Sequence, residues 1–478
     1  MDLFASMTPS WVRQGQRAAK HAARTRWEAD CDVLLDRYLD NGEALRRHRE
    51  RLRKLYPNNA EAMMDNLLTL NLVRKVVDTK AKLYRKPPRR ILLEADGRPA
   101  DGEHPARLLF ERVIRGSRLN ARMKWLLRLT ELLNSAVLWG QVDWRSGLPY
   151  LTVLPPHHLK VVQGTDDPCS LQGAEEILVP LGGRPDTPAA ADDLGYLRYR
   201  RITDCEGESR VMVERVDADG EAWPRQPEEL TAYGALKDYP FVLLRKGEPL
   251  EAELFPDVPQ GLLLAADWLD HELTRGALNS RQTDFPSYVF NGTAEELGTA
   301  APATGAGAIL CLGEEGKEMT KLPVEPREAE RNANILFFLK VFAQSMDMTP
   351  SAFTFDVELL SGTAKFHDKQ PEIEYREDQA DLLVPVEEEE IWPMLRDLAR
   401  IGFGPQADAL DGMRMRANFP EQMIPLSREE ELMNLEREIK LGLRSAAEIL
   451  CERDGLGPEE AKQRVKEHLS LLDADRPA

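Results

Sequence analysis

Two short stretches contain histidines that could hold a metal ion. His271 and Glu272 open the run HELTR, which resembles the start of a zinc-protease helix, where two histidines four residues apart bind zinc and the glutamate acts as base. Arg275 fills the second histidine position, so one ligand is missing. The adjacent pair His157 and His158 could bind a metal only with distant ligands, because two adjacent side chains in a strand or loop point apart. We therefore expect no metal site from either stretch.

Other reactive residue types also lack the spacing that their chemistry needs. The run GEEGKEM, 313–319, has neither the four-residue spacer nor the Ser/Thr of a phosphate-binding loop, and no GxSxG nucleophile turn occurs. Four consecutive glutamates, 387–390, point in different directions around a helix and favour a solvated face over a cation site. The five cysteines form no CxxC pair, which argues against disulfides and structural zinc. The sequence predicts a protein that is not an enzyme and uses no cofactor.

Composition limits the class of protein further. The chain has 478 residues, enough for about three domains, and no uninterrupted apolar run of about 18 residues that would span a membrane. The first twenty residues lack the apolar stretch of a secretory signal, so we expect a cytoplasmic site of synthesis and folding. A net charge of -18 repels phosphate backbones at long range, which disfavours a conventional nucleic-acid binder. Basic runs near 13–26 and 85–90 could touch a polyanion, although a solvated helix face is the simpler interpretation.

The first 245 residues are predicted to combine helices with an antiparallel sheet. Apolar residues at helical spacing predict a helix from Trp27 to the DNG stop at 40–42, another from Leu68 to the Pro87-Pro88 pair, and a third over about 106–137. After Gly140 alternating apolar and polar residues, separated by glycine turns, predict β-hairpins.

Helical patterns return after Gly261. They cover about 261–282, 326–347, 372–401 and three short helices in the last fifty residues. Between the first two lies a small α/β element. The stretch FTFDVELLSGTAKFHDKQP, 353–371, follows the second and is predicted to be a long mobile loop. Pro385 and Pro393 should kink the third helix, and S-x-x-E capping boxes begin at Ser427 and Ser445.

Four segments resemble, in order, segments of the portal proteins of tailed bacteriophages and of gene-transfer particles. They are NLVRKVVDTKAKLYRKPP (71–88), DYPFVLLRKG (238–247), FTFDVELLSGTAKF (353–366) and IPLSREEELMNLEREIKLGLRSAAEIL (424–450). The second lacks the asparagine that often follows it in the family. The resemblance covers about 65–469 and depends on the order of the four segments.

The resemblance implies a helix-rich α+β subunit that assembles into a ring around a central channel. The implied regions are a wing of helices and antiparallel sheet (1–261), a first stem helix (262–282), a clip (283–324), a second stem helix (325–347), a tunnel loop (348–370), a kinked helix that returns to the wing (371–426) and a helical crown (427–478).

A portal ring, commonly of about twelve subunits, would occupy one capsid vertex and form the channel for DNA packaging and ejection. The implied partners are other copies of the chain, double-stranded DNA passing without sequence specificity, the terminase large subunit, a head-tail adaptor, and the major capsid and scaffold proteins, with no membrane. The protein would be a virion component assembled in the cytoplasm of a bacterial host. An acidic channel wall would repel DNA and so let it slide.

Two groups of residues are candidates for this function. The tunnel-loop candidates are Phe353, Phe355, Ser361, Gly362, Lys365 and Phe366. The candidates for terminase or adaptor docking at the clip are Tyr288, Phe290, Asn291, Ile309, Leu310 and Lys321. In the loop the glycine permits bending, the phenylalanines offer apolar contact and the lysine could contact phosphate. Each phenylalanine could equally pack into a neighbouring subunit.

Two alternatives belong to other classes. The first is a metal-dependent DNA-processing enzyme with an unrecognised active site, which requires carboxylates far apart in the sequence to converge on a metal ion. The second is another virion structural component, such as a head-tail adaptor or minor capsid protein, although adaptors are usually much shorter.

Overall fold

The computed structural model shows a helix-rich α+β protein with several small sheets. It describes residues 10–40, 42–57, 60–101, 104–164, 167–181, 195–203, 208–217, 219–247, 253–284, 286–293, 295, 308–312, 318–322, 327–353, 362–420, 428–442, 444–449 and 462–466. The chain divides into two compact units, which are described separately. Unit 1 comprises Met1–Thr354 and Pro371–Pro420, and unit 2 comprises Phe355–Gln370 and Glu421–Ala478.

Unit 1 begins with helices that pack around its later elements. They are α1 (Ser10–Leu39), α2 (Glu43–Leu55), α3 (Ala60–Asp65) and α4 (Leu72–Lys80). Gly42 follows α1 with a φ of 82°, a left-handed conformation that favours glycine, so the predicted stop at 40–42 is confirmed. Asn71 caps α4, because its side-chain oxygen accepts a hydrogen bond from the Arg74 amide.

Two helices and a strand replace the single helix predicted over 106–137. They are α5 (Pro105–Gly116), α6 (Leu119–Leu133) and β2 (Ser135–Asp143). Arg118 and Asn134 have positive φ values of 52° and 60° and end the helical path on either side of α6. The prediction was wrong at its end because β2 is buried on both faces, and a continuous apolar run does not distinguish strand from helix.

Two antiparallel sheets complete the N-terminal half. One has the order β3-β2-β8, with β3 at Leu148–Leu154 and β8 at Phe241–Arg245. The other has the order β4-β5-β6-β7, at Lys160–Val162, Glu176–Pro180, Tyr196–Thr203 and Ser209–Val216. The predicted hairpins are present, and Gly147 takes a φ of 68° in the turn between β2 and β3.

The hydrophobic core of unit 1 lies around β2. Helices α6 and α11 (Trp392–Phe403) both pack against this strand, and α11 approaches so closely that a Cβ on Gly140 would lie 2.6 Å from Leu398 Cδ1. Trp139 joins the two sheets, because its Nε1 donates a hydrogen bond of 3.0 Å to Tyr199 Oη on β6. Residues from both halves of the chain therefore share one core.

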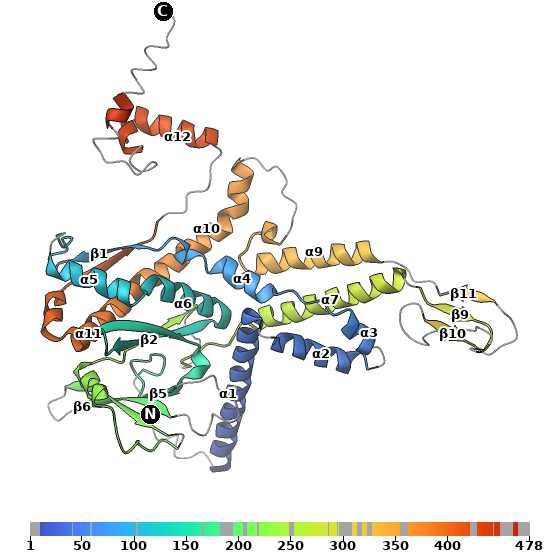
Figure 1. Ribbon diagram of the computed structural model, residues 1–478, viewed down its shortest axis with the longest axis horizontal. Helices are drawn as coiled ribbons and strands as arrows, with labels where there is room; N and C mark the ends of the chain where they lie inside the picture. Colours follow the sequence, from blue (N-terminus) through green and yellow to red (C-terminus); the bar gives the residue numbers. More distant parts are fainter. Residues whose placement is uncertain are drawn as a thin grey trace, which may run out of the picture. The chain divides into compact units, whose positions relative to one another are not determined.

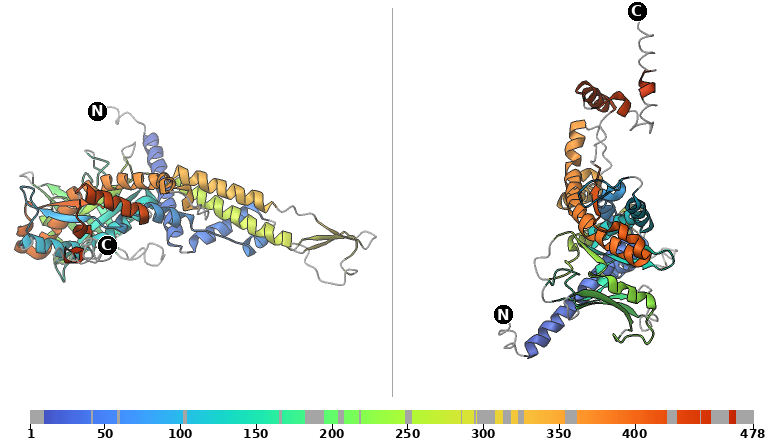
Figure 2. Two further views of the ribbon diagram at one scale, coloured as in Figure 1. Left: turned by 90° about the horizontal axis from the view of Figure 1, so that it is seen from above. Right: turned by 90° about the vertical axis from the view of Figure 1, so that its left-hand side faces the viewer.

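Two long helices lie side by side in unit 1. They are α7 (Gln260–Asp284) and α9 (Glu328–Ser345), found where helices were predicted, and their contact includes Trp268 and Phe338 with ring centroids 4.0 Å apart. Between them in the chain come three short strands, β9 (Tyr288–Phe290), β10 (Ile309–Cys311) and β11 (Met319–Lys321). Figures 1 and 2 show the two helices running together towards this sheet.

A long, irregular helix leads back into the core. It consists of α10 (Gly362–Pro385), a π-helical stretch η6 (Val386–Ile391) and α11. The π-helical stretch lies between Pro385 and Pro393, where a kink was predicted. The helix begins about ten residues before the expected start at 372, so the last part of the expected loop 348–370 is helical. The pair β1 (Arg89–Leu93) and β12 (Arg414–Asn418) joins this region to the N-terminal half.

Unit 2 is described in short pieces. Its helix α12 spans Arg428–Lys440, and the predicted capping box at Ser445 is confirmed by reciprocal hydrogen bonds between Ser445 and Glu448. The other predicted capping serine, Ser427, lies outside the described residues. No helix within the described ranges has the length and apolar character needed to cross a membrane.

Candidate functional site at the ends of the segment between α9 and α10

The two ends of the segment between α9 and α10 meet on the surface of unit 1. After α9 the chain passes through the short 3₁₀ turn η5 (Pro350–Ala352), and the buried Thr349 donates a hydrogen bond of 3.2 Å to Glu372 Oε1 on α10. Lys82 Nζ lies 3.7 Å from the other oxygen of Glu372. Residues 350–371, which include the first turns of α10, are therefore enclosed between two points of unit 1 that touch each other. We call this place the loop base.

A buried carboxylate on α6 holds α10 at the loop base. Glu131 Oε1 accepts hydrogen bonds of 2.5 Å from Tyr375 Oη and 2.6 Å from Gln379 Nε2, both on α10. Lys246 Nζ donates to Glu131 Oε2 at 3.3 Å. The Glu131 side chain is only 4% exposed, and a buried charge is tolerated when its oxygens are paired in this way.

A lysine on α4 holds the other end of the segment. Lys80 Nζ donates a hydrogen bond of 2.9 Å to the carbonyl oxygen of Met346 and lies 4.0 Å from the centre of the Tyr375 ring. Burial and the nearby Lys246 ammonium lower the Lys80 pKa to about 8. Burial and the Glu131 charge raise the pKa of Tyr375, which therefore stays a hydrogen-bond donor. Lys80 of α4 thus contacts both ends of the segment, at Met346 and at Tyr375.

A second buried carboxylate fixes the π-helical stretch that follows α10. Glu387 is fully buried and accepts hydrogen bonds from Arg90 at 2.6 and 2.7 Å and from Tyr84 Oη at 2.5 Å. The neighbouring Glu388 accepts a hydrogen bond from the Ala417 amide at 2.7 Å. The expectation of a solvated face for 387–390 was therefore wrong for these two residues. The partners of Glu387 lie about 300 residues away in the sequence, so no local pattern could predict them.

The tunnel-loop candidates are only partly described. Phe353 is half-buried and packs towards Phe342 on α9, with ring centroids 6.4 Å apart, so it belongs to its own chain's core. Phe355 and Ser361 lie outside the described residues. Gly362 begins α10, and its first turns also contain Lys365 and Phe366, whose side chains are not described.

The clip candidates come together in the sheet of β9, β10 and β11. Tyr288 and Phe290 lie on β9 and face Ile309 and Cys311 of the parallel strand β10. Lys321 on β11 pairs with Tyr288 across the antiparallel ladder, and Asn291 follows β9 directly. Phe290 is buried, whereas four apolar side chains of this sheet and its flanks are exposed: Leu310, Leu312, Met319 and Leu322. The sheet therefore presents apolar surface outside its small core.

Helix α9 is apolar on two faces. One face carries Phe338, Phe342 and Ala343, which pack against α7 and the core. The other face carries Leu336, Phe337 and Val341, which are 45%, 68% and 48% exposed. We call the three exposed residues the outer face of α9.

The histidines of the sequence analysis lie in two places. His271 makes a hydrogen bond of 2.9 Å between its Nε2 and Tyr56 Oη. His157 and His158 lie on the 3₁₀ turn η3 (Pro156–His158), with ring centroids 4.5 Å apart. The expectation that these two side chains point apart was wrong, because it assumed extended backbone.

Among known proteins, similar chains were found only by comparison with solved structures. No family model matches the sequence, and no curated protein matches it. One similar chain comes from the virion of a native gene transfer agent (GTA) particle, with 14% identity and a TM-score of 0.37 over 84% of this chain and 95% of that chain. A chain from the neck of an empty GTA particle computed with C6 symmetry has 12% identity and a TM-score of 0.38 over the same shares. A chain from the neck of a native GTA particle computed with C12 symmetry has 12% identity and a TM-score of 0.35, over 79% of this chain and 88% of that chain.

Proposed function

We propose that this chain is a non-enzymatic subunit of a portal-type ring at one vertex of a phage-like particle, through whose channel DNA is packaged and ejected. The outer face of α9 is the observation that carries the proposal. Monomeric proteins rarely expose Leu, Phe and Val together along one helix, because covering such a stripe releases water from apolar surface. In a ring, α9 of one subunit meets a different surface of the next, and the contact repeats until the ring closes.

The loop base supports the same function. The buried polar contacts of the loop base lie outside residues 354–361, so a role for those residues does not require unit 1 to change. In a ring, copies of residues 354–361 would project from equivalent bases and contact DNA whose helical symmetry differs from that of the ring. Contacts without base recognition suit such a passage, and the net charge of -18 keeps DNA from adhering elsewhere.

The sheet β9-β10-β11 is the proposed docking surface for the packaging terminase and later for a head-tail adaptor. It lies between α7 and α9 in the chain, and its exposed leucines and methionine offer an apolar contact of the kind that partner proteins cover. Polar substitutions at Leu310 and Leu312 should therefore weaken the docking of partner proteins while ring assembly is still intact.

Native mass spectrometry and electron microscopy of the purified full-length chain test the proposal. We expect closed rings with a central hole and one dominant subunit number. A monomer at several salt concentrations and micromolar protein would contradict the proposal. In that case a metal-dependent nuclease assay on the same sample would test the enzyme alternative, since the ring and the enzyme predict opposite results.

A further inference from the structure

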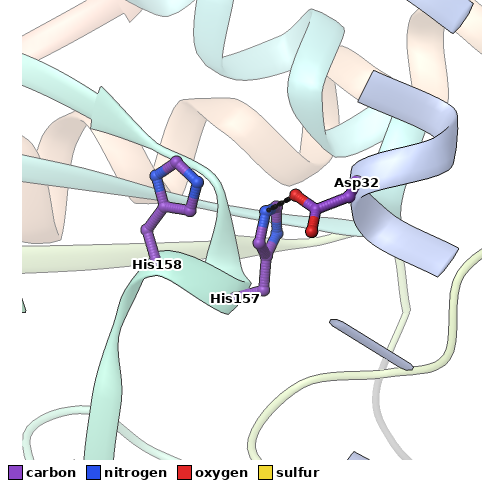
Figure 3. Close-up of side chains that lie close together, drawn as sticks. All are labelled: Asp32, His157 and His158. Atoms are coloured by element: carbon purple, nitrogen blue, oxygen red, sulfur yellow. Dashed lines mark hydrogen bonds and ion pairs between the residues drawn. The ribbon is translucent and has the colours of Figure 1, made fainter. Parts of the chain in front are cut away.

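A group of three metal-binding side chains lies where α1 crosses the turn η3. The group consists of Asp32 on α1 and His157 and His158 on the turn, and one ligand atom from each lies within 4.8 Å of the others. His157 Nε2 and Asp32 Oδ1 are 3.0 Å apart. Figure 3 shows the carboxylate facing the His157 ring, with the His158 ring beside it. The two elements are 125 residues apart in the sequence, so only folding brings the ligands together.

The state of His157 points to a further ligand. Its side chain is only 5% exposed, and its second ring nitrogen, Nδ1, is buried without a hydrogen-bond partner among the described residues. In native proteins an unpaired buried nitrogen is unusual and is accounted for by strain, by catalysis or by a bound water or ion. Asp32, by contrast, is 53% exposed, which leaves the group open to solvent.

The group is close to the size of a zinc site. Ligand atoms bound to one zinc ion at about 2.0–2.1 Å in a tetrahedral arrangement lie about 3.4 Å apart, so the side chains need to close by about 1 Å or slightly more.

We propose that Asp32, His157 and His158 bind one divalent transition-metal ion, with zinc as the best fit. Two imidazoles and one carboxylate supply three ligands, and water completes a four-coordinate shell. The ion fastens α1 to the sheet region of unit 1, beside contacts that already join them: Arg24 to the Leu159 carbonyl and Trp27 to the Pro256 carbonyl. The inference is independent of the proposed ring function.

Equilibrium dialysis of the untagged, chelator-treated full-length protein against Zn²⁺, with the metal counted by mass spectrometry, tests the site. We expect about one ion per chain at saturation, and about tenfold or greater weakening of affinity in Asp32→Asn and in His158→Ala. Glu28→Gln is the matched control, because Glu28 lies one turn earlier on the same helix and pairs with Arg24 instead. The control should bind zinc as the wild type does.

A further readout separates a metal site from a purely structural contact. Cobalt(II) bound in place of zinc should give the intense visible absorption of a four-coordinate ion in the wild type and in Glu28→Gln, and this absorption should be lost in His158→Ala. Equal zinc binding by the wild type and by Asp32→Asn/His158→Ala, with unchanged circular dichroism, would overturn the proposal. So would the absence of binding by a folded wild-type chain.

Discussion

At the scale of single residues, the loop base depends on a few buried charges. Glu131 accepts hydrogen bonds from two side chains of α10 and from Lys246. Lys80 donates a hydrogen bond to the Met346 carbonyl after α9 and lies over the ring of Tyr375. A hydrogen bond to a buried charge contributes more to stability than a hydrogen bond between neutral groups, because water cannot reach the charge to replace a lost partner. Single side chains should therefore control how firmly the loop ends are held.

Removal of one hydroxyl tests this point. Tyr375→Phe keeps the ring over Lys80 but leaves Glu131 with one donor fewer, so we expect the free energy of unfolding to fall by about 1.5–3 kcal/mol. Urea denaturation measures the loss. Tyr150→Phe, at a more exposed tyrosine, is the control and should change stability by less than about 0.5 kcal/mol. Equal effects of the two variants would show that the network does not hold α10.

His48 should make stability depend on pH. Burial, together with the charges of His271 and Arg37, lowers the His48 pKa from 6.5 to about 4, and its Nε2 lies 3.2 Å from Thr274 Oγ1. The unfolded chain therefore binds a proton between pH 6.5 and 4 that the folded chain does not. The stabilisation is complete above pH 6.5 and is lost as the pH falls towards 4, by up to about 3 kcal/mol.

Thermal unfolding between pH 7 and pH 4 measures this loss. In His48→Gln, which keeps a polar side chain but cannot titrate, the fall in unfolding temperature over that range should be smaller than in the wild type. Parallel curves for the two proteins would show that other groups control the acid sensitivity.

At the scale of elements, one close backbone approach positions α11 against the β2–β3 hairpin. A Cβ on Gly402 would collide with the carbonyl oxygen of Gly147, so only glycine fits without movement. We expect Gly402→Ala to destabilise by about 1–3 kcal/mol. Gly261→Ala in α7 is the matched control, because nothing lies within 4 Å of its added methyl group, and it should be neutral or stabilising by about 0.4–1 kcal/mol. Urea denaturation compares the two, and a tolerated Gly402→Ala would contradict the close packing.

The segment between α9 and α10 should be separable from the fold. Replacing 354–361 with a Gly/Ser linker of equal length should leave unfolding temperature and ring assembly unchanged, because the loop base lies outside the replaced residues. DNA packaging or retention should fall. The same eight-residue replacement at 182–189 is the control and should leave packaging intact. Failure of the first variant to form rings, observed by native mass spectrometry, would show that the segment serves assembly instead.

At the scale of the whole molecule, assembly should depend on apolar contact more than on charge. Subunits that each carry a net charge of -18 repel one another at long range, so an attractive surface must outweigh that repulsion. The outer face of α9 offers such a surface. Higher salt screens the repulsion and should favour the ring.

Charge placed on the outer face of α9 should therefore dissociate the ring. Phe337→Glu with Val341→Glu puts two carboxylates where we propose that the next subunit packs, and we expect monomers or small oligomers by native mass spectrometry. Leu108→Glu, at a residue of α5 that is 62% exposed, is the control and should still form rings. Rings of unchanged mass from the double variant would mean that another surface closes the assembly.

The sequence by itself determined the elements whose signals are local. The stop after α1, the hairpin turn at Gly147, the long helices α7 and α9 and the capping box at Ser445 all follow from residue types within a few positions of one another. Such signals act through backbone geometry and short-range hydrogen bonds, so they can be recognised before the chain folds.

Only the tertiary structure decided which distant residues meet. The end of the predicted helix over 106–137 became the central strand β2, because α6 and α11 both bury it. Glu387 was expected on a solvated face, but it is buried and accepts hydrogen bonds from Arg90 and Tyr84. Asp32 lies beside two histidines of a turn that is more than a hundred residues away in the sequence. Burial and long-range pairing depend on how whole elements pack together. The hydrophobic periodicity of one segment does not indicate which distant element it will pack against.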